Sequence, residues 1–282
     1  MLFIIILCAV IALFFYCVSP ALRRHPNSQL CKNLFVAHRG LHSLKDGIPE
    51  NSITAIKRAA DMGYGVEIDI HITLDGKIVV FHDDTLMRAC GVNKRIKNLT
   101  YNELCEFKLF GTQEKIPTLD EVLKAVNGRT MLVIEFKCSD AGFKRLCTAA
   151  DKLLRQYNGK YIVQSFNPLP MFWYRHNRPD ICRGQLSTDF FRQPKNNALK
   201  AAAGLLILNM ISRPDFISYD MRYVKAFPRK ICSFLGAIRA GWTFTELSQV
   251  ERVKKNFDIY IFLRDFFPKS RELKIHKNSR KN

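Results

Sequence analysis

Two histidines, three carboxylates and two basic side chains lie at the ends of short apolar segments. They are His38, Arg39, Glu67, Asp69, His82, Glu135 and Lys137. Glu67 and Asp69 are two residues apart, as are Glu135 and Lys137, so each pair shares one face of an extended strand. Carboxylates are hard oxygen ligands suited to Mg²⁺ or Ca²⁺, basic side chains suit a phosphate, and histidines transfer protons near neutral pH. This combination predicts metal-assisted cleavage of a phosphodiester.

Each of these features alone has a simpler structural interpretation. A histidine at the end of a strand is often a hydrogen-bonded structural residue, and a carboxylate pair with this spacing also occurs on the exposed face of an edge strand. Taken together, that interpretation needs at least five ionisable groups in apolar strands without a function. Because burying such groups costs free energy, we favour the chemical interpretation.

Around these residues, short strand-like runs alternate with amphipathic helical patterns. Strands are predicted over 34–38, 65–70, 130–136, 161–166, 181–186, 216–219, 235–242 and 258–263. Helical patterns lie between them, for example over 50–62, 118–127, 141–157 and 245–256. This α/β alternation is typical of a parallel sheet covered by helices. Eight strands are the number that closes a (β/α)8 barrel, whose carboxyl-terminal strand ends would bring the polar side chains together.

Two segments do not fit the alternation. Residues 77–82 follow an Asp75-Gly76 turn, which is a hairpin signal, so we expect them to fold back antiparallel beside the preceding strand. Residues 84–117 are mixed and polar without being rich in Gly or Ser. We expect them to form a small inserted subdomain between the hairpin and the next helix.

An ordered series of short motifs runs through residues 36–91. The series reads H-R-G, P-E-N-S, E-x-D, T-x-D-G and V-x-x-H-D. It resembles the glycerophosphodiester phosphodiesterase (GDPD) family, and further matches follow at 116–119, 121–123, 134–137, 164–166 and 242–243. The resemblance covers roughly residues 33–263 and is strongest before residue 137.

The resemblance implies a TIM barrel over about 33–265 with a small inserted domain at about 84–117. It also implies divalent-metal-dependent hydrolysis of glycerophosphodiesters to sn-glycerol 3-phosphate and an alcohol. On the matching positions it implies an acid–base pair, phosphate contacts and metal ligands, which are respectively His38 and His82, Arg39 and Lys137, and Glu67, Asp69 and Glu135.

Four further positions receive supporting roles from the resemblance. Glu50 and Asn51 would support the loop after the first strand, behind the groups that contact substrate and metal. Phe166 and Trp242 would line the glycerol or alcohol side of the site, although packing in the apolar core explains them equally well.

The sequence departs from the family pattern at two places. Ser52 stands where Thr is usual, a change that keeps the hydroxyl. The last strand usually ends in a T-D-x-P-like motif, whereas here it reads FLRDFFP. Either Asp265 and Pro268 are displaced equivalents or the loop has diverged, and we expect an altered substrate rim rather than lost catalysis.

The amino terminus is apolar. Residues 1–22 carry no charge and are followed by Arg23 and Arg24, and no basic residue or good cleavage site marks a signal peptide. We therefore expect a single uncleaved transmembrane helix over 1–22, which by the positive-inside rule places the catalytic domain in the cytoplasm. Nine cysteines without a C-x-x-C pair agree with free thiols in a reducing compartment.

The chain is strongly basic, with 44 Lys and Arg against 25 Asp and Glu. A net charge of +19 indicates a negatively charged partner. The tail over 268–282 holds six Lys/Arg and one Glu, and it is either a solvated end or a contact for an anionic membrane surface. Nucleic acid is not expected, because the basic residues are scattered and no helix-turn-helix, zinc-finger or RNP pattern is present.

Three functions fit these observations. The first is a membrane-anchored glycerophosphodiester phosphodiesterase with a phosphate-bearing small substrate. The second is a lysophospholipase D-like enzyme that acts on lysolipid in the bilayer, favoured by the apolar segment, the basic tail and Phe190, Phe191, Phe266 and Phe267. The third is a membrane-tethered binder without turnover, against which the intact set of motifs argues.

Overall fold

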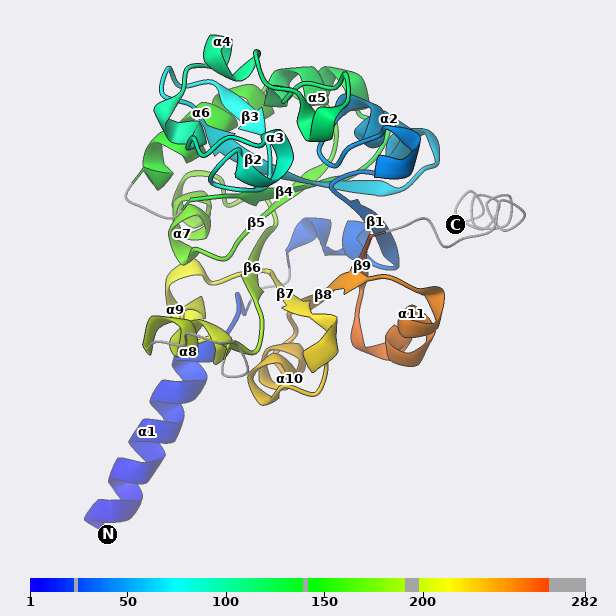
Figure 1. The fold of residues 1–282 in the computed structure, drawn as a ribbon. Helices are drawn as coiled ribbons and strands as arrows, with labels where there is room; N and C mark the ends of the chain where they lie inside the picture. Colours follow the sequence, from blue (N-terminus) through cyan, green and yellow to red (C-terminus); the bar gives the residue numbers. More distant parts are fainter. Residues whose placement is uncertain (23–24, 139–141, 191–197, 264–282) are drawn as a thin grey trace.

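Eight parallel strands close into a barrel surrounded by helices in the computed structural model of the chain (Figure 1). The structure describes residues 1–22, 25–138, 142–190 and 198–263. Around the ring the strand order is β1-β9-β8-β7-β6-β5-β4-β2, and pairing of β1 with β2 completes it. The predicted TIM barrel is confirmed.

The parallel strands fall on the eight predicted segments, with ends shifted by a few residues. Their bounds are β1 Leu34–His38, β2 Gly65–Ile72, β4 Leu132–Phe136, β5 Tyr161–Ser165, β6 Arg183–Ser187, β7 Phe216–Asp220, β8 Ile238–Phe244 and β9 Ile259–Phe262. Strand β3, Ile78–Val80, pairs antiparallel with β2 outside the ring, as the Asp75-Gly76 turn predicts.

Helices follow the strands and cover the barrel (Figure 1). Their bounds are α2 Ile53–Asp61, α5 Leu119–Val126, α6 Phe143–Leu154, α7 Pro168–Asn177, α8 Ala198–Gly204, α9 Asn209–Ser212, α10 Phe227–Phe234 and α11 Leu247–Val253. Side-chain caps fix two of the starts. Ser52 Oγ accepts from the backbone N–H of Ala55, and Thr118 forms a capping box with Glu121. The hydroxyl that Ser52 keeps is therefore used to start α2.

The amino-terminal end of the barrel is closed by residues 26–31. This segment, Pro26–Cys31, forms a short 3₁₀ helix. Cys31 is fully buried and packs into the barrel interior with Val36, Val133 and Ile261. These side chains fill the barrel interior, which is a packed core and not a pore. Barrels of this kind carry their sites at the opposite, carboxyl-terminal end, where the polar strand ends lie.

Residues 84–117 form the expected insertion and pack around a hydrophobic cluster of their own. The segment contains α3 Met87–Cys90, α4 Tyr101–Leu104 and two 3₁₀ turns, Ile96–Asn98 and Leu109–Gly111. Leu86, Ile96, Leu104 and Leu109 are buried together against Phe81, which follows β3. The insertion is thereby attached to the β2–β3 hairpin, next to the site.

The membrane-spanning helix expected over residues 1–22 is not supported. Helix α1 covers Leu2–Val18, which is 17 residues, and it ends at Ser19, whose backbone is extended. The physical reason is Pro20, because the residue before a proline is disfavoured in the helical region. In the part of the chain that the structure describes, no helix is both long enough and apolar enough to cross a membrane.

Helix α1 is held at its carboxyl end and otherwise projects away from the barrel (Figure 1). The carbonyl of Val18 accepts from Asn209 Nδ2 at 2.8 Å, and Arg213 Nη1 donates to the carbonyl of Tyr16 at 2.7 Å. The backbone N–H of Ala21 donates to Pro214 just ahead of β7. These contacts attach α1 at the amino-terminal end of the strands. The predicted basic tail at 268–282 and the divergent FLRDFFP motif beyond Leu263 lie outside the described residues.

Candidate active site

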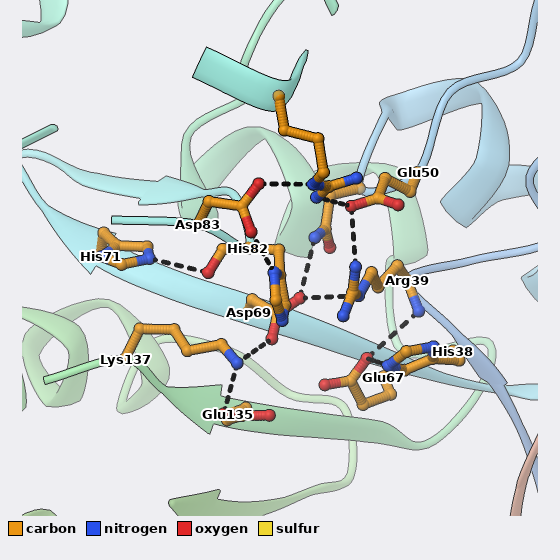
Figure 2. Close-up of polar contacts among 12 residues, drawn as sticks. His38, Arg39, Glu50, Glu67, Asp69, His71, His82, Asp83, Glu135 and Lys137 are labelled. Atoms are coloured by element: carbon orange, nitrogen blue, oxygen red, sulfur yellow. Dashed lines mark hydrogen bonds and ion pairs between the residues drawn. The ribbon is translucent and has the colours of Figure 1, made fainter. Parts of the chain in front are cut away.

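Strand register brings the predicted polar side chains together at the carboxyl-terminal end of the barrel. His38 lies beside Glu67 across the β1–β2 pair, and Asp69 lies beside Glu135 across β2–β4. Lys137 comes directly after β4. Figure 2 shows these side chains pointing toward one another from neighbouring strands.

The three carboxylates form a buried acidic cluster. Each of Glu67, Asp69 and Glu135 offers an oxygen within 4.8 Å of those of the other two, and their exposed fractions are 1%, 0% and 6%. Burial and the other two carboxylates raise the pKa of Glu67 well above its ordinary value. Burial also raises the pKa of Glu135 to about 7, although Lys137 opposes the shift. Hard oxygen donors that repel one another in this way fit a divalent cation, which would relieve the repulsion.

Two positively charged side chains, Lys137 and Arg39, lie among these carboxylates. Lys137 Nζ lies 2.5 Å from Glu135 Oε1 and 3.1 Å from Asp69 Oδ1, while Arg39 Nε lies 3.4 Å from Asp69 Oδ2. Although burial opposes it, these two charges hold the pKa of Asp69 well below its usual range. The site therefore holds both the negative charge that attracts a metal ion and the positive charge that attracts a phosphate.

The H-R-G and P-E-N-S motifs meet in the loop after β1. Arg39 has φ 58°, and its backbone N–H donates to Glu67 Oε2 at 3.1 Å. Gly40 has φ +82°, and a Cβ there would lie 2.7 Å from the backbone of Ala55, so the turn needs glycine. Asn51 is buried, and its Nδ2 donates to Asp69 Oδ2 at 3.0 Å. The loop thus orients two members of the acidic cluster.

The two predicted acid–base histidines have different surroundings. His38 Nε2 lies 4.0 Å from Glu67 Oε2, and burial, followed by the Arg39 charge, lowers the pKa of His38 well below its usual range. His82 Nδ1 lies 2.6 Å from Asp83 Oδ1, a pairing that fixes the orientation of its ring. Burial lowers the pKa of His82 as well, whereas the charge of Asp69 and the hydrogen bond to Asp83 oppose the shift.

The remaining predicted positions divide between the two sides of the site. Glu50 Oε1 accepts from Arg39 Nη1 at 2.9 Å and therefore positions the guanidinium. Phe166, after β5, and Trp242, in β8, meet edge to face with ring centroids 5.8 Å apart. Phe190 adds a third ring 6.4 Å from Phe166, and Phe166 is 37% exposed. Phe166 follows the carboxyl end of β5, and Trp242 lies beside Asp220 at the carboxyl end of β7, so these rings border the same end of the barrel.

Three residues next to the site were assigned no role from the sequence. Asp83 contacts His82, Arg88 joins Asp83 to Glu50, and His71 Nε2 lies 3.3 Å from the carbonyl of His82. Asp83 lies within the V-x-x-H-D motif, so its position beside His82 was a usable signal. Arg88 and His71 belong to no motif that the sequence analysis singled out.

The raised pKa values of the acidic cluster predict how stability depends on pH without metal. Glu67 and Glu135 bind protons more tightly in the folded chain than in the unfolded one, where such groups titrate near about pH 4.3. This difference in proton affinity makes its full contribution to the free energy of unfolding below that pH, and the contribution is lost as pH rises toward about 7. We expect the Tm of Glu67→Gln in EDTA to exceed that of the wild type by a margin that grows from pH 5 to pH 7.

Thermal unfolding followed by circular dichroism would measure this margin. Saturating Mg²⁺ or Ca²⁺ should shrink it, because a bound cation stabilises the charged carboxylates of the wild type. A Tm difference that does not change with pH would contradict the assignment of strained, buried carboxylates.

A (β/α)8 barrel with carboxylates, histidines and basic side chains at the carboxyl ends of its strands is typical of a class of phosphoric ester hydrolases. The sequence model of the glycerophosphoryl diester phosphodiesterase family matches residues 38–207, and the chain belongs to this family.

Individual relatives agree with this membership. The chain is 32% identical over 234 residues to a glycerophosphodiester phosphodiesterase of Caldanaerobacter subterraneus subsp. tengcongensis, covering 79% of this chain and 90% of that protein. It is 31% identical over 157 residues to a lysophospholipase D of Rattus norvegicus, covering 51% and 48%. In fold it is similar to an Oleispira antarctica phosphodiesterase solved with sn-glycerol 3-phosphate, with a TM-score of 0.68 and 22% identity over 83% of this chain and 94% of that one.

Proposed function

We propose that the chain hydrolyses glycerophosphodiesters to sn-glycerol 3-phosphate and an alcohol, using Mg²⁺ or Ca²⁺. The observation that carries the proposal is the buried cluster of Glu67, Asp69 and Glu135 with His38 and His82 beside it. Family membership and the product bound by the Oleispira antarctica enzyme support the substrate class.

The charged groups divide the work of binding between them. Glu67, Asp69 and Glu135 would hold the cation, and Arg39 and Lys137 would contact the phosphate oxygens, Arg39 with its planar guanidinium. When bound, the cation supplies positive charge that stabilises the negative charge developing on the phosphate. Lys137 and Arg39 already form ion pairs with these carboxylates. A bound metal would compete with the two side chains for the carboxylates, and a bound phosphate would compete with the carboxylates for the two side chains, so the ion pairs would rearrange.

The histidines would transfer the protons of the reaction. One histidine, as the neutral imidazole, would remove the proton from the attacking water or glycerol hydroxyl, and the other, as the imidazolium, would give its proton to the leaving oxygen. His82 has the better support for carrying a positive charge, since the Asp83 carboxylate lies 2.6 Å from its Nδ1. His82 would then present Nε2 to the reacting atoms.

The aromatic rings give the non-charged part of the substrate a place to bind. Phe166 is partly exposed, and Trp242 packs against it. A glycerol or alcohol group would lie between these rings and the acidic cluster. The size and polarity of the side chains around these rings would then determine which diester is preferred.

The second candidate substrate is a lysolipid, and the named activity of the Rattus norvegicus relative supports it. The position of α1 favours the small diester instead. Phe3, Ile4 and Ile5 on α1 are exposed, so we propose that α1 contacts a lipid layer. Its attachment next to Pro214 lies at the end of the barrel opposite to His38 and Glu67, which separates the site from that layer.

An anionic membrane surface is a further proposed partner. Arg175 and Arg213 lie at the base of α1, where they line a cavity with Tyr16, and they would attract acidic lipid headgroups. None of the nine cysteines forms a disulfide, and we propose a cytoplasmic location for the barrel, where thiols stay reduced.

A substrate comparison tests the proposed function. We expect the full chain to release sn-glycerol 3-phosphate from soluble glycerophosphocholine and glycerophosphoglycerol in the presence of divalent metal. Activity on lysophosphatidylcholine vesicles with none on soluble diesters would favour the lysophospholipase D-like function. Metal binding without turnover of either substrate would favour the non-catalytic binder.

A further inference from the structure

The insertion contributes one side chain that reaches the site. Arg88 belongs to α3, which lies within residues 84–117. Its Nε donates to Asp83 Oδ2 at 2.6 Å, and its Nη2 donates to Glu50 Oε1 at 2.6 Å. One planar guanidinium therefore joins two carboxylates that come from different segments of the chain.

Each of these carboxylates is itself bonded to a side chain of the proposed chemistry. Asp83 uses its other oxygen, Oδ1, to contact His82 Nδ1 at 2.6 Å. Glu50 Oε1 accepts from Arg39 Nη1 at 2.9 Å as well as from Arg88. Two unbroken chains of contacts result, Arg88–Asp83–His82 and Arg88–Glu50–Arg39, and Figure 2 shows Glu50, Asp83, His82 and Arg39 along them.

We propose that Arg88 is a positioning residue through which the insertion fixes the orientations of the His82 ring and the Arg39 guanidinium. This inference rests on the proposed phosphodiesterase function and adds to it a role for the insertion. Arg88 acts through Asp83 and Glu50, so the stronger effect is expected on the step that uses His82, whose ring has Asp83 as its hydrogen-bonding carboxylate.

The arrangement differs from an ordinary surface salt bridge. The Arg88 side chain is 44% exposed, but its carboxylate partners are 15% and 24% exposed and already committed to Arg39 and His82. The guanidinium also lies over the ring of Phe110, 5.4 Å from its centroid, inside the insertion. Because the Arg88 guanidinium holds both Asp83 and Glu50, removing it leaves each carboxylate with one fewer hydrogen bond to fix its orientation.

Steady-state kinetics of Arg88→Ala and Arg88→Lys on a glycerophosphodiester would test the role. We expect Arg88→Ala to lower kcat by about 10- to 100-fold, as a small displacement of a reacting group does, with KM changed less than kcat. Arg88→Lys should restore little of the loss, because an ammonium cannot form the same two-pronged contact. Removing Arg88 in a His82→Ala background should lower kcat by much less than it does in the wild type.

Lys94→Ala is the matched control. Lys94 is another exposed basic residue of the insertion, and its ammonium group lies over the ring of Phe107, 5.7 Å from the centroid. It should leave kcat unchanged, and the Tm of both variants shows whether the insertion stays folded. Unchanged kcat in a folded Arg88→Ala, or equal losses in the wild-type and His82→Ala backgrounds, would overturn the inference. An inactive wild type would overturn the proposed function itself, which makes the two failures distinguishable.

Discussion

Glu67→Gln will lose at least about 10³-fold in kcat/KM for glycerophosphodiesters, because charge stabilisation by a bound cation is worth several kcal/mol. Glutamine has nearly the same shape but supplies a neutral oxygen where the cation requires a charged one. The Glu67 carboxylate also accepts a hydrogen bond from the backbone N–H of Arg39, so the same change weakens the attachment of the loop after β1. Calorimetric titration with Mg²⁺ and Ca²⁺ should show weakened binding in the same variant.

Asp120→Asn is the control for loss of one negative charge. Asp120 lies on the outside of α5, where its carboxylate pairs with Lys124, and its replacement should leave both kinetics and metal affinity unchanged. Near-wild-type turnover by Glu67→Gln would remove Glu67 from the metal site. Loss of activity with unchanged metal affinity would assign Glu67 to holding Arg39 instead.

His82→Ala will lower kcat by at least about 10²-fold, as expected for a positioned general acid or base. The imidazole is held by Asp83 at 2.6 Å and faces the acidic cluster, so alanine removes a proton carrier without opening the barrel core. Asp83→Asn should give a smaller loss, since the ring remains but its charged form is less stabilised.

His176→Ala provides the comparison for His82→Ala. His176 is an exposed histidine in the last turn of α7, and its Nδ1 lies 2.8 Å from the carbonyl oxygen of Phe172. It should retain wild-type kinetics. Turnover by His82→Ala that equals the wild type would exclude His82 from proton transfer.

The barrel could be predicted because its strands are apolar runs separated by helical patterns, and parallel strands buried on both faces read in this way. The antiparallel β3 followed from the Asp75-Gly76 turn. The acidic cluster followed from the two-residue spacing of Glu67 and Asp69, which fixes a shared face in any extended strand. These features are local, so the sequence records them directly.

Features that depend on long-range contacts could not be predicted in the same way. Arg88 lies in a helix of four residues and reaches Glu50, 38 positions earlier in the chain, which no spacing rule records. The length of α1 was overestimated because the uncharged stretch continues to residue 22, whereas Pro20 determines where the helix ends.

The release of sn-glycerol 3-phosphate from glycerophosphocholine tests the central claim most directly. The full chain, stripped with EDTA and then supplied with Mg²⁺ or Ca²⁺, should release this product only after the metal is added, and Glu67→Gln should release almost none under either condition. Release that continues at the same rate in EDTA, or that survives in Glu67→Gln, would contradict a phosphodiesterase whose cation is held by Glu67, Asp69 and Glu135.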